Sequence, residues 1–167
     1  MHPIADLQIE YSLISRGIER EILPTCRELG IGVTAYGVLS RGLLSGRFQQ
    51  THHKSDFRAG APRFTGANLD ANLALVEKLR AVAATIGVSV AQVAIAWVVA
   101  RAQAQSASII PVMGARRRDQ LAESLGALDI ALSDAQLADI ERAVPHNAAA
   151  GERYPAAHLV DMDSERR

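Results

Sequence analysis

The segment that decides the fold is Ser108-Ile-Ile-Pro-Val-Met-Gly-Ala-Arg-Arg-Arg118, in a chain of 167 residues. Residues 108–112 form a short apolar run like a buried strand, and Pro111 places them at a strand end or a sheet edge because proline cannot donate a ladder hydrogen bond. Gly114 then supplies a turn. A helix is predicted to follow, with apolar residues at helical spacing at Leu121, Leu125 and Leu128. A strand, a glycine turn and a helix in this order are typical of an α/β fold with a parallel sheet.

Two further strands and a helix are predicted near the start of the chain. In residues 4–13, apolar and polar side chains alternate at the two-residue period of a strand. Residues 17–29 have apolar residues at helical spacing and are followed by Gly30, which suits a helix C-cap, although Pro24 lies inside them. Residues 31–39 are rich in β-branched and apolar residues, as in a strand covered on both faces. Strand, helix and strand predict a parallel crossover unit.

The middle of the chain is predicted to be a long loop followed by two helices. Residues 40–66 are rich in glycine and basic side chains, and loops of this length without regular structure are usually functional or disordered. The first helix has apolar side chains on one face and ends at Gly87. The second begins with a capping box formed by Ser89 and Gln92.

The last predicted helix and the tail define the domain organisation. Ser133 and Gln136 form a second capping box, and no periodic pattern follows Pro145. We therefore expect one α/β domain over residues 1–145 and an irregular tail over residues 146–167.

Composition excludes several functions. Eighteen basic and eighteen acidic residues give a net charge of zero, so the chain lacks the broad positive field that nucleic-acid or anionic-membrane binding requires. Cys26 is the single cysteine, which favours a reducing compartment, and we expect a cytoplasmic protein without a secretory signal. The most apolar run, residues 88–100, is too short to cross a membrane. His52 and His53 have no nearby carboxylate or cysteine to complete a metal shell, so no metal site is predicted.

Two features could bind a ligand, and each also has a structural explanation. Arg116, Arg117 and Arg118 lie at a predicted helix start, where backbone N–H groups and the helix dipole favour phosphate. They could equally be a solvated basic surface. Tyr36, at the end of the second strand, could stack on a flat ligand or could be a core tyrosine with a satisfied hydroxyl.

Three motifs taken together resemble the aldo-keto reductase family. They are Gln8-Ile-Glu-Tyr-Ser-Leu13, Ala35-Tyr-Gly-Val-Leu-Ser-Arg-Gly-Leu-Leu-Ser-Gly46 and Ile110-Pro-Val-Met-Gly-Ala-Arg-Arg-Arg-Asp-Gln-Leu-Ala-Glu-Ser-Leu-Gly-Ala127. The resemblance covers nearly the whole chain. It implies a partial (β/α)8 TIM barrel that consists of the last three strands with their helices, which is the carboxyl-terminal half of such a protein.

The resemblance also implies a cofactor, NADP(H), and the residues that bind it. These residues are Gln8, Tyr36, Gly37, Leu39, Gly42, Gly114, Arg116, Gln120 and Glu123. By the resemblance, Gln8 holds the carboxamide, Tyr36 stacks on the nicotinamide, and Gly37, Leu39 and Gly42 line the pyrophosphate. Arg116 would pair with the 2′-phosphate, and Gln120 and Glu123 would hold the adenosine. Ser124 stands where the family usually has an asparagine that reads the adenine, so this contact is expected to be weaker.

The catalytic group of the family has no match in this chain. The aspartate, tyrosine, lysine and histidine belong to the first four strands, and neither Lys54 nor Lys78 matches the lysine. Asp6 and Tyr11 have the family's spacing, but five residues apart on a strand they face opposite sides of a sheet. No catalytic residue is assigned, so a small-molecule carbonyl substrate is expected only when an amino-terminal half completes the barrel. Alternatives are self-association, a non-catalytic cofactor-binding or scaffold protein, and a truncated inactive product.

Overall fold

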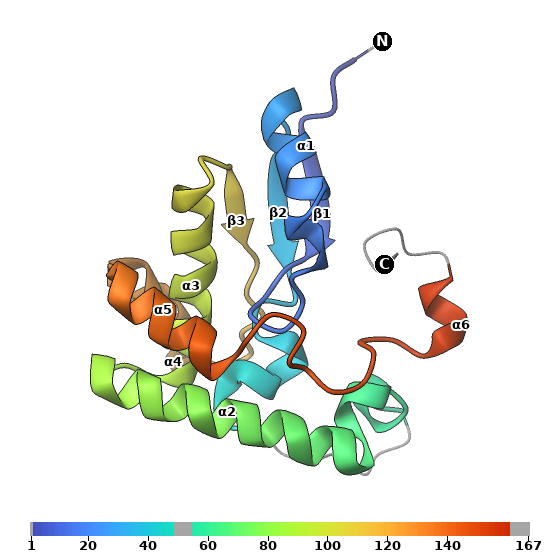
Figure 1. Ribbon diagram of the computed structural model, residues 1–167, viewed down its shortest axis with the longest axis vertical. Helices are drawn as coiled ribbons and strands as arrows, with labels where there is room; N and C mark the ends of the chain where they lie inside the picture. Colours follow the sequence, from blue (N-terminus) through green and yellow to red (C-terminus); the bar gives the residue numbers. More distant parts are fainter. Residues whose placement is uncertain (1, 49–54, 161–167) are drawn as a thin grey trace.

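The computed structural model describes residues 2–48 and 55–160, and its centre is a parallel three-stranded sheet (Figure 1). The strands, in their order across the sheet, are β1 (Asp6–Glu10), β2 (Gly32–Tyr36) and β3 (Ile109–Pro111). Gln8, Thr34 and Ile110 lie opposite one another across the three strands. The predicted parallel sheet is confirmed, with strands shorter than the patterns that predicted them.

The described residues form six α-helices, and two of them begin with a side-chain cap. They are α1 (Ile22–Leu29), α2 (Gly66–Ile86), α3 (Val90–Ala104), α4 (Arg118–Gly126), α5 (Asp134–Ala143) and the short α6 (Ala156–Leu159). Both predicted capping boxes are confirmed, that of Ser89 and Gln92 at α3 and that of Ser133 and Gln136 at α5. Gly87 ends α2 with a φ of 82°, the left-handed conformation that glycine adopts without a Cβ penalty.

The predicted helix over residues 17–29 is divided into two parts. A 3-10 turn, η1 (Gly17–Glu19), precedes α1, which begins only at Ile22. Pro24 is therefore the third residue of α1, where a backbone N–H would have no acceptor within the helix, and proline is tolerated there.

The segment predicted as a long loop over residues 40–66 contains short turns in the part that the structure describes. The segment contains the 3-10 helices η2 (Ser40–Ser45), η3 (Phe57–Ala59) and η4 (Pro62–Phe64). Leu43, Leu44 and Phe64 are buried in the core, so apolar side chains hold these turns against the domain. His52 and His53 lie outside the described residues.

Helices cover one face of the sheet and leave the other open. Val33 and Ala35 of β2 are buried against this helical layer, in which Trp97 of α3 is fully enclosed. On the opposite face, Gln8 is exposed and Ile110 retains 62% of its accessible surface. The sheet therefore has one side packed on helices and one side open, an alternation that strands in the wall of a barrel also have.

The apolar face predicted for the helix after β3 is present but uncovered. Leu121 and Leu125 lie on α4, and Leu128 lies on the following 3-10 turn η5 (Ala127–Asp129). Their exposed fractions are 48%, 55% and 60%. The helical spacing is correct, but these leucines do not belong to the core of this chain.

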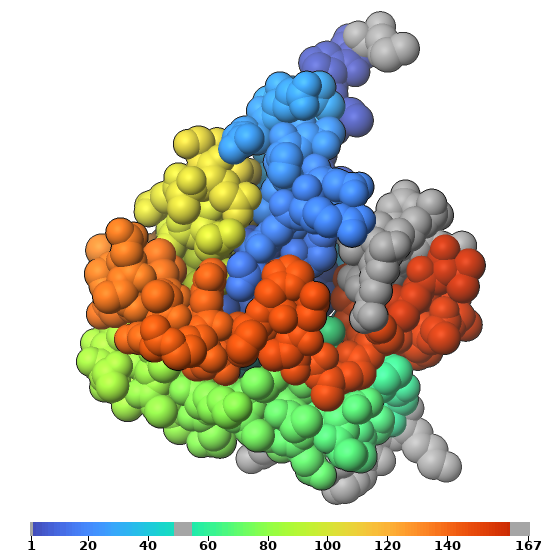
Figure 2. All heavy atoms as spheres, viewed as in Figure 1, coloured from blue at the N-terminus to red at the C-terminus, as the bar shows by residue number. Residues whose placement is uncertain are grey.

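The segment after α5 runs along α2 on the face seen in Figure 2, where it is coloured orange to red. The buried side chain of Asn72 holds it in place by accepting a hydrogen bond from the N–H of Ala150 (2.8 Å) and donating one to its carbonyl (2.9 Å). Gly151 adopts a φ of 75°, and a Cβ there would approach the backbone of Pro62 to 2.9 Å. Only glycine fits at position 151, where the tail passes close to the backbone of Pro62.

No single helix in residues 2–48 and 55–160 is both long and apolar enough to cross a membrane. Helices α2 and α3 pass that test only as a pair, and they are bent by 83° at the break between them.

Candidate functional site

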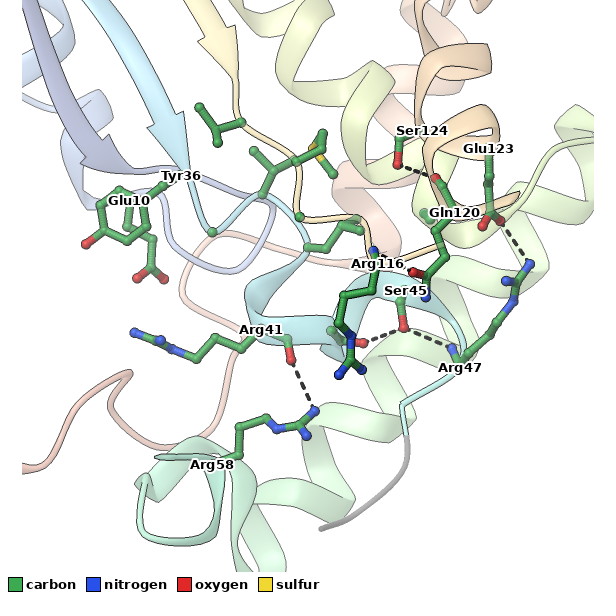
Figure 3. Close-up of a pocket in the computed structure, with 18 residues that line it drawn as sticks. Glu10, Tyr36, Arg41, Ser45, Arg47, Arg58, Arg116, Gln120, Glu123 and Ser124 are labelled. Atoms are coloured by element: carbon green, nitrogen blue, oxygen red, sulfur yellow. Dashed lines mark hydrogen bonds and ion pairs between the residues drawn. The ribbon is translucent and has the colours of Figure 1, made fainter. Parts of the chain in front are cut away.

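A cavity of about 510 Å³ lies where the carboxyl ends of the three strands meet (Figure 3). Its lining comes from Glu10 at the end of β1, from the turn that follows β2, from residues 112–114 after β3, and from the side of α4. Ligands of parallel α/β proteins bind at this end of the strands because the loops that follow them converge there. Of the nine predicted cofactor residues, all but Gln8 line the cavity.

The turn after β2 owes its shape to a run of left-handed residues. Ser40, Arg41 and Gly42 have φ values of 45°, 54° and 93°. At Gly37, φ is 68° and a Cβ would come within 2.9 Å of Glu10 Cγ, so glycine is required. Ser40 and Arg41 carry a Cβ in this conformation, and such backbone strain is concentrated at functional sites. The turn places Gly37, Val38, Leu39, Arg41 and Gly42 along one wall of the cavity.

The arginines at the start of α4 differ in their roles. Arg117 pairs with Asp119 at 2.5 Å, and that hydrogen bond raises the pKa of the guanidinium. Arg116 extends into the cavity, and the structure gives it no ion pair within residues 2–48 and 55–160 (Figure 3). Its backbone N–H donates to Oε1 of Gln120 at 3.1 Å, which holds the turn against the helix.

The far end of the cavity contains polar side chains whose hydrogen bonds are already defined. Arg47 pairs with Glu123 at 3.3 Å across the cavity. Ser124 donates its hydroxyl to the carbonyl of Gln120 at 2.9 Å, back into its own helix. The shorter serine side chain is thus directed to the backbone, consistent with the weaker adenine contact expected for this position.

A buried ion pair lies at the other end, beside Tyr36. Glu10 Oε2 accepts from Arg153 Nη1 at 2.9 Å, and the side chains of both residues are only 5–6% exposed. Glu10 Oε1 accepts from the hydroxyl of Ser15 at 2.9 Å. The pKa of Tyr36 is raised, first by burial and next by its hydrogen bond with Tyr154, while Arg153 acts in the opposite sense. This end is therefore formed jointly by β1, β2 and the tail.

Two residues from the sequence analysis lie away from the cavity: Gln8, a predicted cofactor residue, and Tyr11, which has the family's spacing from Asp6. Gln8 is exposed on the open face of the sheet, two residues before Glu10, and is not among the lining residues. Tyr11 is fully buried on the helical side, where its hydroxyl donates to Glu19 Oε1 at 2.6 Å and its ring packs 5.5 Å from that of Trp97. Burial raises the pKa of Tyr11 above its usual range, and the Glu19 carboxylate raises it further. Tyr11 is a structural residue of the helical layer.

Tyr11→Phe is accordingly expected to change stability and not chemistry. Losing the hydrogen bond to Glu19 should lower the free energy of unfolding by about 1.5–3 kcal/mol, the usual range for a bond to a charged group. The dissociation constant for NADPH should stay within twofold of the wild-type value. Urea unfolding and a fluorescence titration measure the two quantities. Steady NADPH-dependent reduction of a reactive aldehyde by the chain, abolished in Tyr11→Phe, would contradict this assignment.

Sequence reasoning missed several lining residues. Glu10, Arg41, Arg47 and Arg58 all contribute side chains to the cavity. The first three lie inside or beside the quoted motifs, but their residue type alone did not distinguish them from surface charges. Arg153 was given no role in the site, because its partner Glu10 is 143 residues away in the chain.

Comparison with known proteins identifies the family. The aldo/keto reductase family model matches residues 1–145, and this chain belongs to that family. A probable aldo-keto reductase 1 from Glycine max is 39% identical over 156 residues, which are 92% of this chain and 44% of that protein. The chain thus spans less than half the length of this relative.

Solved structures agree with this assignment. The glycerol dehydrogenase AKR11B4 from Gluconobacter oxydans is 32% identical, with a TM-score of 0.74 over 87% of this chain and 45% of that one. An aldo/keto reductase from Klebsiella pneumoniae, in complex with NADP and acetate, is 25% identical, with a TM-score of 0.59 over 90% of this chain and 43% of its own. The three-stranded sheet and its helices are therefore part of a fold of the aldo-keto reductase type.

Proposed function

We propose that this chain is the NADP(H)-binding, carboxyl-terminal half of an aldo-keto reductase barrel. The observation that carries the proposal is the cavity at the strand ends, into which Arg116 extends without an ion pair to any described residue. Family membership and the NADP bound to the Klebsiella pneumoniae relative support it. The reaction class is the interconversion of a carbonyl compound and an alcohol.

The residues of the cavity suit the parts of a nicotinamide dinucleotide phosphate. Tyr36 offers a flat ring for the nicotinamide, and the backbone from Gly37 to Gly42 offers a wall for the pyrophosphate. The turn at Gly114 borders open space and presents Arg116, whose guanidinium fits a phosphate with two parallel hydrogen bonds. Bound NADPH supplies the hydride that reduces a carbonyl carbon.

We infer that further β/α units continue the sheet at both edges, supplied by the same polypeptide or by an amino-terminal half-barrel partner. Strands β1 and β3 each pair on one side only within the described residues. The leucines of α4 and η5 are exposed, and Ile110 is exposed on the open face of the sheet, so each presents apolar surface that suits burial against another unit. Such units would also supply the proton donor for the carbonyl oxygen.

A fluorescence titration of NADPH into the purified chain tests the function. Emission of the reduced nicotinamide should change saturably as it enters the cavity, with a stoichiometry of one. Substituting Gly37→Val, which forces a side chain into Glu10, should weaken binding at least about tenfold by deforming the turn. No saturable binding, or equal binding in Gly37→Val protein that still shows the wild-type far-UV circular dichroism, would contradict the proposed cofactor site.

A further inference from the structure

Arg41 has an environment that differs from that of the other cavity arginines. It projects from the strained turn after β2 towards the end of the cavity that contains Tyr36 and Glu10 (Figure 3). Its guanidinium carbon lies 4.3 Å from the ring centre of Phe57 and 5.0 Å from that of Tyr154. Both distances are in the range of cation–π contacts.

The aromatic contacts orient the guanidinium without neutralising it. The rings of Phe57 and Tyr154 meet edge to face at 5.5 Å, so the turn, η3 and the tail all fix the position of Arg41. An aromatic ring contacts the face of a guanidinium, whereas its N–H groups point outwards in the plane. Arg41 can therefore stack on these rings and still donate two parallel hydrogen bonds to an anion.

Other arginines nearby are paired with carboxylates, whereas Arg41 can still pair with an anionic ligand. Arg47 is paired with Glu123, Arg58 with Asp56, and Arg153 with Glu10. Across the part of the chain that the structure describes, Arg41 and Arg116 are the arginines of this cavity for which no ion pair is recorded. The proposed function assigns Arg116 to the 2′-phosphate. Arg41 is the remaining positive charge, and it lies towards the Tyr36 end.

We propose that Arg41 makes the site selective for carbonyl substrates that carry an anionic group, a carboxylate or a phosphate. This inference rests on the proposed function, which places the nicotinamide, and hence the carbonyl carbon, beside Tyr36. An anion on the substrate would pair with the in-plane N–H groups of Arg41 while the carbonyl faces the nicotinamide. Phe57 and Tyr154 act as positioning residues for the guanidinium.

The experiment compares the full wild-type chain with Arg41→Gln, which removes the charge and keeps hydrogen-bonding capacity. Arg142→Gln is the matched control, because Arg142 is an exposed arginine of α5, paired with Asp139 and outside the cavity. NADPH affinity is measured first. Binding of aldehydes is then measured by ligand-observed NMR at low ionic strength, with NADP+ present so that no reduction occurs, and again without cofactor. The probes are succinic semialdehyde against butyraldehyde, and glyceraldehyde 3-phosphate against glyceraldehyde.

In the wild type and in Arg142→Gln, at least one anionic probe should bind about tenfold more tightly than its neutral counterpart. In Arg41→Gln the ratio should fall to about one, while any loss of NADPH affinity stays well below tenfold. The pair of probes that shows this ratio distinguishes a carboxylate from a phosphate as the preferred anion.

Equal binding of anionic and neutral probes to the wild type, or an unchanged ratio in Arg41→Gln, would overturn the proposal. A tenfold loss of NADPH affinity in Arg41→Gln would assign Arg41 to the cofactor instead. Failure of the wild type to bind NADPH counts against the proposed function, and the titrations without cofactor then decide on Arg41 separately.

Discussion

Replacing Arg116 with alanine is expected to weaken NADPH binding about ten- to a hundredfold and to leave NADH binding unchanged. The side chain extends into the cavity, and the structure records no ion pair for it among the described residues. Charge-assisted hydrogen bonds from a guanidinium to a phosphate contribute roughly 1.5–3 kcal/mol, which corresponds to this loss of affinity. NADH has a hydroxyl in place of the 2′-phosphate, so its affinity does not include this charge-assisted interaction with Arg116.

Arg118→Ala is the matched control, because Arg118 is exposed at the start of the same helix and does not line the cavity. It should reduce affinity for both cofactors by less than twofold at 0.15 M salt, where charges beyond about 8 Å are screened. Titrations of all three proteins with NADPH and NADH give, for each variant and each cofactor, the ratio of its dissociation constant to that of the wild type. Equal affinity of the wild type for both cofactors, or a parallel loss in Arg116→Ala, would remove Arg116 from the specificity role and leave it a solvated surface arginine.

Local sequence signals predicted the elements of the fold, and the resemblance to the aldo-keto reductase family predicted residues that line the cavity. Capping boxes, glycine C-caps and strand periodicity depend on residues a few positions apart, and these predictions are confirmed at Ser89, Ser133 and Gly87. The motif glycines also identified the correct end of the sheet, because their positions follow strand ends directly. The predicted residues Tyr36, Gly37 and Gly114 all line one cavity.

Features that depend on distant parts of the chain were not predictable in this way. Spacing identified a helical apolar face at Leu121 and Leu125, but it cannot tell which surface that face contacts, and in this structure it is exposed. The 3-10 turns after residue 40 are held by buried side chains such as Leu44 and not by a local periodicity. Equally, nothing near Arg153 indicates that its side chain is buried against Glu10.

The second large expected effect is on stability, and it concerns the buried ion pair of Arg153 and Glu10. Arg153→Met should lower the free energy of unfolding by about 3–5 kcal/mol, because it leaves the buried carboxylate of Glu10 without its cation. The remaining donor is the hydroxyl of Ser15, which itself accepts from Arg63 at 3.0 Å and supplies no net charge. Chemical denaturation followed by far-UV circular dichroism measures the change.

Two further variants separate loss of the pair from loss of packing. Arg142→Met removes an arginine from the exposed pair with Asp139, where the cost should be at most about 1 kcal/mol. The double variant Glu10→Gln with Arg153→Met removes both charges, and it should recover much of the stability lost in Arg153→Met, since a buried charge without a partner costs more than a buried pair replaced by neutral groups. Glu10 packs against Gly37 at the cavity wall, so Arg153→Met should also weaken NADPH binding, and the double variant should restore part of it. If the double variant is no more stable than Arg153→Met, the cost is one of packing, and the tail stabilises the cavity through contacts such as those of Tyr154 rather than through the charge of Arg153.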